Sequence, residues 1–217
     1  MKITKITPYA ADYEQTSKSK LGRKWVFLKM ETDEGIHGWG EVGSSVAVSE
    51  NFMGTAIKEV SESLIGENPM DTDRLWNKIF RLFSYMGSRG FTTSLTAGFD
   101  IALWDIKGKV SGLPIYDLLG GRYRDPVRLY CNAWFPNCST PEDYAKAAKT
   151  NLVENGHSAC KLDPFLEMTQ FHTMYQDGFI SQKGEQLGYD IVAAVREVVG
   201  PAFEILIDAH GHYNVPN

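Results

Sequence analysis

The residues of this chain that could do chemistry most directly are a carboxylate and an imidazole in its last segment. Asp208 ends the apolar run 203–207, and His210 follows two residues later. Strand side chains alternate between faces, so these two groups would point the same way, with His212 continuing the alternation as a substrate contact or as a loop residue. In α/β barrels the C-terminal strand ends carry the chemistry. We therefore interpret Asp208 as a metal-binding carboxylate and His210 as a proton-transferring group.

The polar segment 11–24 holds further candidates, because it contains four basic side chains: Lys18, Lys20, Arg23 and Lys24. Two interpretations stay open. The segment is either a solvated loop between two strands or a lid that closes over an anionic substrate. On the second interpretation, Arg23 and Lys24 are candidate substrate-binding residues.

The composition argues against several classes of partner. The chain has 217 residues, 43% of them hydrophobic, and a formal net charge of −5 from 22 basic and 27 acidic residues. This balance argues against nucleic acid, and no basic run suggests an anionic membrane surface. No apolar stretch approaches the roughly 20 residues of a membrane span. The N-terminus alternates like a strand, unlike a signal peptide, and the odd number of cysteines, 3, fits a reducing cytoplasm.

The elements that must position these residues fall into two regions, of which the first combines strands with helices. Alternating or apolar runs predict strands at 1–6, 25–32 and 36–42, the last two joined by a turn. Apolar residues at helical spacing predict helices over 49–64, 71–83 and 92–110, with a short extra turn at 115–119. We place a domain boundary near residues 122–125.

The second region alternates strands and helices. The pattern predicts strands at 127–132, 158–162 and 203–208, with one helix from residue 140 and another over 185–199. This spacing is typical of parallel βαβ units. About 20 residues rich in Phe, Met and Gln follow the second strand, and a loop of that length is usually functional or mobile.

Three motifs of the first region resemble those of the mandelate racemase-like branch of the enolase superfamily. Residues 32–41 (TDEGIHGWGE) are similar to its cap hairpin, and residues 97–109, 113–114 and 118–121 are similar to its cap helix and exit. The resemblance implies an α+β N-terminal capping domain, residues 1–124. The first strands and helices of an α/β (TIM-type) barrel would follow, residues 125–217. With about three strands, the barrel is expected to be incomplete in this chain.

The resemblance also implies a reaction, the removal of a proton α to a carboxylate with Mg²⁺ stabilising the developing charge. Asp208 matches the first of three metal ligands, since carboxylate oxygens suit Mg²⁺. His210 would act as general acid on a departing hydroxyl, as in the galactonate dehydratase-like group. Racemases of the branch carry Lys-x-Lys where this chain has Lys161 and Asp163, which argues against a two-base racemase. Lys161 would instead bind and neutralise the substrate carboxylate, with Asp163 and His212 as further substrate contacts.

The resulting expectation is a Mg²⁺-dependent dehydratase that eliminates water from a sugar acid to give a 2-keto-3-deoxy acid. A racemase, epimerase or cycloisomerase is the alternative within the superfamily. A noncatalytic fragment is the alternative of another class, because the remaining ligands and the base are expected beyond residue 217 and the chain alone should be inactive. The family analogy further implies a cytoplasmic homo-oligomer, a dimer or an octamer.

Overall fold

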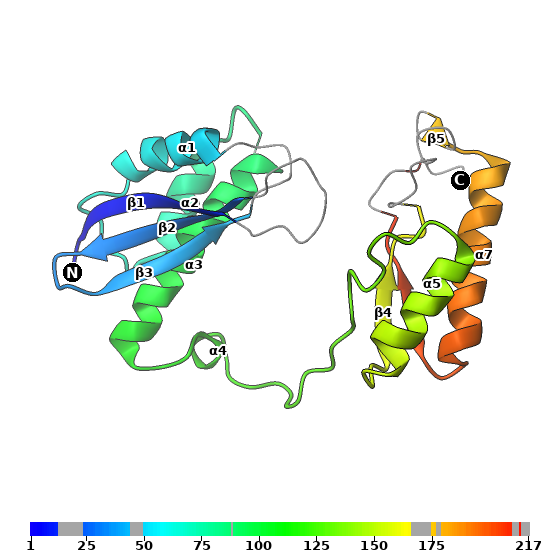
Figure 1. Ribbon diagram of the computed structural model, residues 1–217. Helices are drawn as coiled ribbons and strands as arrows, with labels where there is room; N and C mark the ends of the chain where they lie inside the picture. Colours follow the sequence, from blue (N-terminus) through cyan, green and yellow to red (C-terminus); the bar gives the residue numbers. More distant parts are fainter. Residues whose placement is uncertain are drawn as a thin grey trace. The chain divides into compact units, whose positions relative to one another are not determined.

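The computed structural model describes residues 1–12, 24–43, 50–87, 89–165, 175–176, 179–209 and 213. The chain divides into two compact units, Met1–Asp125 and Pro126–Asn217. Each unit has its own elements and its own core (Figure 1). The assignment of residues 1–124 to a capping domain and 125–217 to a barrel domain stays a prediction.

The first unit is built on an antiparallel sheet with strand order β1-β2-β3. Its strands are β1 (Ile3–Asp12), β2 (Lys24–Thr32) and β3 (His37–Val42). The β2–β3 hairpin was predicted and is confirmed, and Gly35 supplies the positive φ of +80° that its turn requires. The first strand is longer than predicted. A register shift between Ile3 and Lys5 places Ile3 and Ile6 on the same buried side of the sheet.

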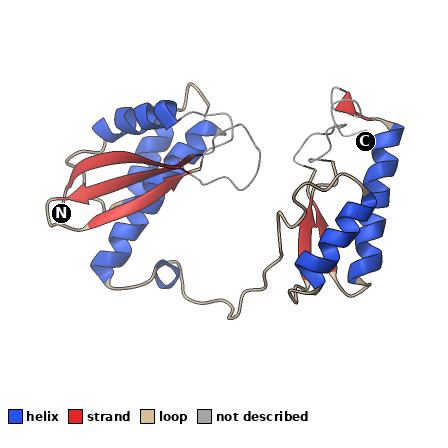
Figure 2. Cartoon of the chain, in the orientation of Figure 1, coloured by secondary structure: helices blue, strands red, loops and turns tan. Residues whose placement is uncertain are grey.

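Helices cover one face of this sheet (Figure 2). They are α1 (Glu50–Glu62), α2 (Thr72–Leu82) and α3 (Phe91–Ser111), followed by the short α4 (Ile115–Leu118). Helices α1 and α3 contact the strands, and α2 packs on α3. Apolar residues at helical spacing close the core, because Ile57, Leu75 and Leu103 have no exposed surface. The three long helices therefore lie where the apolar periodicity predicts them.

Two glycines of β3 allow α3 to approach the sheet closely. A Cβ atom at Gly38 would overlap the carbonyl oxygen of Ala102, and one at Gly40 would overlap that of Gly98. Side chains larger than hydrogen are therefore excluded from this interface. Asp105 adds a polar link, since its Oδ2 accepts a hydrogen bond of 2.9 Å from the backbone N–H of Trp39. The hairpin and helix motifs thus fit each other directly.

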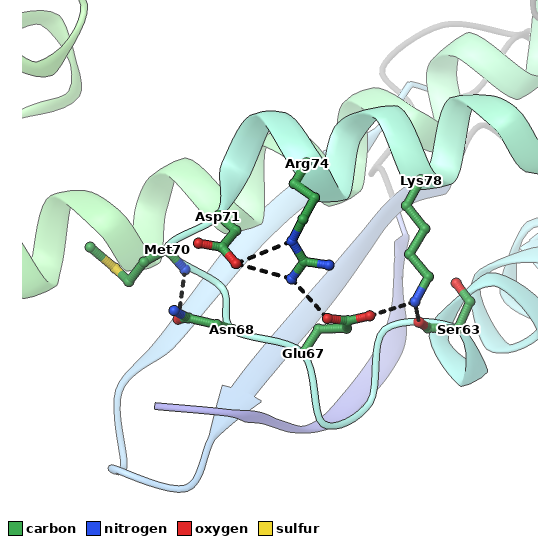
Figure 3. A network of polar contacts seen from close by, with 7 residues as sticks. All are labelled: Ser63, Glu67, Asn68, Met70, Asp71, Arg74 and Lys78. Atoms are coloured by element: carbon green, nitrogen blue, oxygen red, sulfur yellow. Dashed lines mark hydrogen bonds and ion pairs between the residues drawn. The ribbon is translucent and has the colours of Figure 1, made fainter.

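The connection between α1 and α2 is held by a network of charged side chains (Figure 3). Glu67 accepts a hydrogen bond of 2.8 Å from Nη2 of Arg74 and one of 2.5 Å from Nζ of Lys78. These two cations lower the pKa of the Glu67 carboxyl from 4.5 to about 2. The backbone N–H of Ile3 also donates to the carbonyl of Glu67, so the network ties this connection to the start of β1.

The second unit pairs two parallel strands with two helices. Its elements are α5 (Pro141–Ala148), the π-helical turn η1 (Lys149–Val153), β4 (Ala159–Leu162), β5 (Tyr175–Gln176), β6 (Phe179–Ile180), α7 (Gln182–Val199) and β7 (Glu204–Ile207). Helices α5 and α7 pack together and cover β4, and Tyr144, Leu152 and Ile191 lie fully buried between these elements. The parallel βα arrangement predicted for this region is confirmed.

Two details of the second unit differ from the prediction. The segment 127–132 is not a strand: only Cys131 pairs, in a single parallel bridge to Cys160. Its apolar side chains remain exposed, Val127 by 66% and Leu129 by 79%, because no strand lies beside them in the described part of the chain. The long predicted loop also contains the small β5–β6 hairpin. Among the described helices, none is long and apolar enough to cross a membrane.

Candidate functional site

Two of the predicted site residues, Lys161 and Asp208, come together at the carboxyl edge of the β4–β7 pair. The parallel register places Leu162 opposite Ile207, and the backbone N–H of Asp208 donates to the carbonyl of Leu162 at 3.0 Å. The strands therefore end side by side. Across this edge Nζ of Lys161 lies 2.9 Å from Oδ2 of Asp208, so two residues that are 47 positions apart form an ion pair.

The backbone of Lys161 is held from the other side of β4. Its N–H donates a hydrogen bond of 2.8 Å to the carbonyl of Cys131. Its own carbonyl accepts a hydrogen bond of 3.0 Å from Nε1 of Trp134. The hydrogen bond to Asp208 raises the pKa of the Lys161 ammonium, so this side chain stays charged at neutral pH. The edge thus presents one fixed cation beside one half-buried carboxylate.

Asp163 lies just past the strand and turns inward. It is only 3% exposed, and its Oδ1 accepts a hydrogen bond of 2.9 Å from the backbone N–H of Phe165. A carboxylate placed in this way stabilises the turn that follows β4. Its predicted contact with substrate stays a prediction.

The other predicted site residues lie outside the part of the chain that the structure describes. They are His210, His212 and Arg23, together with the side chain of Lys24. The structure thus brings Lys161 and Asp208 together and describes Asp163 behind them. The proton transfer predicted for His210 and the substrate contacts of the others remain predictions.

The described residues fit part of a Mg²⁺ site. A half-buried carboxylate at a strand end, already paired with a cation, is a suitable oxygen ligand. Within the described ranges, however, no three His, Cys, Asp or Glu side chains come close enough together to hold a metal ion. Asp208 therefore fits as a single ligand, and the described residues do not supply the remaining ligands.

The cysteines near this edge are free thiols in the described structure. Burial is the main cause that raises the pKa of Cys160 to about 11, with Cys131 contributing. A thiol with that pKa is protonated at neutral pH and is a poor nucleophile. Cys160 is therefore a packing residue of the second core.

The sequence interpretation missed one supporting residue, Trp134. Trp134 is 3% exposed, and its ring packs edge-on against Phe135 and Tyr144. Its Nε1–H donates a hydrogen bond to the carbonyl of Lys161. The adjacent Trp134 and Phe135 after a predicted strand were a signal for a buried aromatic cluster. The partner of the indole N–H could not be read from spacing, because it lies 27 residues away.

Comparison with known proteins supports the same family from three directions. The family model described as mandelate racemase / muconate lactonizing enzyme, N-terminal domain, matches residues 5–120. A D-galactonate dehydratase from Pectobacterium atrosepticum is 36% identical over 217 residues, which are 100% of this chain and 50% of that protein. A D-galactonate dehydratase from Ralstonia pickettii is 35% identical over 216 residues, again 50% of its length. The chain thus spans about half the length of the curated relatives it matches.

Solved structures show the same likeness in three dimensions. A member of the enolase superfamily from Salmonella Typhimurium superposes with a TM-score of 0.83 at 33% identity. The match covers 98% of this chain and 55% of that one. Both the cap motifs and the βα unit that carries Lys161 and Asp208 lie within this match. The chain belongs to the mandelate racemase / muconate lactonizing enzyme family of the enolase superfamily.

Proposed function

We propose that the protein to which this chain belongs is a Mg²⁺-dependent sugar-acid dehydratase, a hydro-lyase. The observation that carries the proposal is the Lys161–Asp208 pair at the carboxyl edge of two parallel strands. In a chain of this family, a carboxylate and an ammonium at that edge suit a metal ion and an anionic substrate. Relatives named D-galactonate dehydratase, 36% and 35% identical across the chain, favour elimination of water.

Each candidate residue has a distinct role in this proposal. Asp208 would be one ligand of Mg²⁺, which when bound supplies positive charge to stabilise an anionic transition state. Lys161 would bind the substrate carboxylate, because its ammonium stays charged beside Asp208. His210 would donate a proton to the departing 3-hydroxyl, which leaves as water after a base removes the α-proton.

The remaining candidates would contact the substrate. Arg23 and Lys24 would face its anionic or hydroxyl groups, with Asp163 and His212 near the strand ends. Asp163 is a poor candidate for a second base, because it is buried and its Oδ1 accepts a hydrogen bond from the N–H of Phe165. This observation favours a dehydratase over a two-base racemase or epimerase.

The test is a Mg²⁺-dependent screen of sugar acids with the whole protein, detecting 2-keto-3-deoxy acids as semicarbazones. Asp208→Asn should reduce kcat by at least about 100-fold, since it removes a charged ligand while keeping the side-chain shape. The matched control is Asp190→Asn, an exposed carboxylate on α7 that should leave activity unchanged. Turnover that survives both EDTA and Asp208→Asn would contradict the proposal.

Location and assembly are part of the same proposal. We expect a cytoplasmic protein, because free thiols such as Cys160 persist in a reducing compartment. We also expect a dimer or an octamer, by family analogy. Light scattering of the whole protein tests the assembly directly.

A further inference from the structure

Helix α2 has three faces, and one of them belongs neither to the core nor to the charged network around Glu67. The core face carries Thr72, Leu75 and Ile79, and the face drawn in Figure 3 carries Arg74 and Lys78. The third face carries an acid, two aromatic rings and an amide: Asp73, Trp76, Asn77 and Phe80. Residues three and four apart are neighbours on a helix, so these four side chains form one stripe.

This stripe forms one wall of a surface groove between α2 and α3. The groove has a volume of about 330 Å³ and is lined by Asp73, Trp76, Asn77, Asp100 and Trp104. That volume is at the small end of the range for ligand pockets, which run from about 300 Å³ upward. Trp76 is 37% exposed, and its ring stacks on Phe80 at 5.1 Å and 11°. The groove can therefore hold one side-chain-sized group against a lining that includes two indoles.

Two carboxylates line the groove, those of Asp73 and Asp100. In the described part of the chain, neither Asp73 nor Asp100 forms an ion pair. Burial raises the pKa of Asp100, and the nearby Asp73 carboxylate adds to the effect. An ammonium lies at this groove, because Nζ of Lys107 is 5.0 Å over the ring of Trp104 and donates a hydrogen bond to Oγ1 of Thr72.

We propose that this groove binds the guanidinium group of an arginine side chain presented by a partner polypeptide. Charge complementarity favours a cation, since two carboxylates line the groove and the one ammonium beside Trp104, that of Lys107, offsets only one of them. A guanidinium suits the walls better than an ammonium does, because it stacks on an indole face while donating to a carboxylate. Phe80 extends the aromatic strip beyond the groove, so an apolar residue beside the arginine would find a surface to cover.

The test uses the full chain labelled with ¹⁵N at its indoles and titrated with three probes. These are N-acetyl-arginine amide, N-acetyl-citrulline amide and N-acetyl-arginyl-leucine amide. The arginine probes should shift the indole signals of Trp76 and Trp104 and leave that of Trp134 in place. Citrulline, which has nearly the same shape without the charge, should bind at least about threefold more weakly. The dipeptide should bind more tightly than arginine alone, because leucine adds apolar contact.

Substitutions separate a specific site from general charge attraction. Asp100→Asn and Asp73→Asn should each weaken arginine binding by about three- to tenfold. Asp117→Asn, which removes the same charge from α4, is the matched control and should have no effect. Equal shifts with citrulline, or equal losses in all three variants, would overturn the site. Equal affinity for arginine and the dipeptide would overturn the polypeptide as the source of the guanidinium.

Discussion

Nζ of Lys161 and Oδ2 of Asp208 lie 2.9 Å apart and join the ends of two parallel strands. The side chains are 22% and 35% exposed, so the pair is partly screened by water. Its position matters more than its energy. In the function proposed above, this cation and this carboxylate would hold an anionic substrate and a metal ion as neighbours.

This pair makes stability depend on pH in the alkaline range. Asp208 raises the pKa of Lys161 in the folded state above its ordinary value of 10.5. The contribution of the pair to stability is therefore fully present below about pH 10.5 and is lost as pH rises through the folded-state pKa. Lys161→Met should be less stable than the wild type at about pH 9, and the difference should shrink as pH rises above about 10.5. Urea unfolding followed by the ¹⁵N-indole signal of Trp134 measures it.

The control for this prediction is Lys146→Met, which removes an exposed lysine from α5 in the same unit. It should not change the pH dependence of unfolding. A difference between wild type and Lys161→Met that stays constant across this pH range would show that the ion pair does not contribute through its charge.

Glu67 makes the opposite pH prediction in the first unit. Its pKa is lowered to about 2 by Arg74 and Lys78, so its contribution is present above its ordinary pKa of 4.5 and is lost as pH falls toward 2. Glu67→Gln should lower the free energy of unfolding by about 1 kcal/mol at neutral pH. The loss should shrink as pH falls below about 4.5. Glu62→Gln, an exposed acid on α1, is the control and should show neither effect.

Substitution of glycine by alanine should have opposite effects at Gly40, which lies in the β3–α3 contact, and at Gly54, which lies in α1. Gly40→Ala should destabilise the first unit by about 3 kcal/mol, because the new Cβ would overlap the carbonyl oxygen of Gly98. Gly54→Ala, in α1, meets only Pro8 at 3.9 Å and should stabilise by about 0.5 kcal/mol. Urea unfolding of both variants tests the close approach, and equal effects of the two would argue against it.

The sequence predicted the elements better than the contacts between them. The β2–β3 hairpin and helices α1–α3 follow from local signals, the turn at Gly35 and apolar residues at helical spacing. Asp208 and Lys161 were each placed at a strand end in this way. Their separation was not predictable, because it depends on the β4–β7 register. The prediction of a strand at 127–132 was wrong for the same reason, because an apolar run becomes a strand only where neighbouring strands pair with it.

The capping box of α5 offers a test confined to the second unit. Oγ1 of Thr140 accepts a hydrogen bond of 3.2 Å from the backbone N–H of Asp143. In return, Oδ2 of Asp143 accepts a hydrogen bond of 3.1 Å from the backbone N–H of Thr140. Thr140→Ala should therefore destabilise the unit by about 1 kcal/mol, and Thr140→Ser should retain the cap. Trp134 is the one tryptophan in residues 126–217, so its ¹⁵N-indole signal, followed separately from those of the four tryptophans in residues 1–125, reports this unit. Thr150→Ala, an exposed threonine of η1, should stay within about 0.5 kcal/mol of the wild type. A Thr140→Ala midpoint equal to that of Thr150→Ala would mean that the cap does not hold the start of α5.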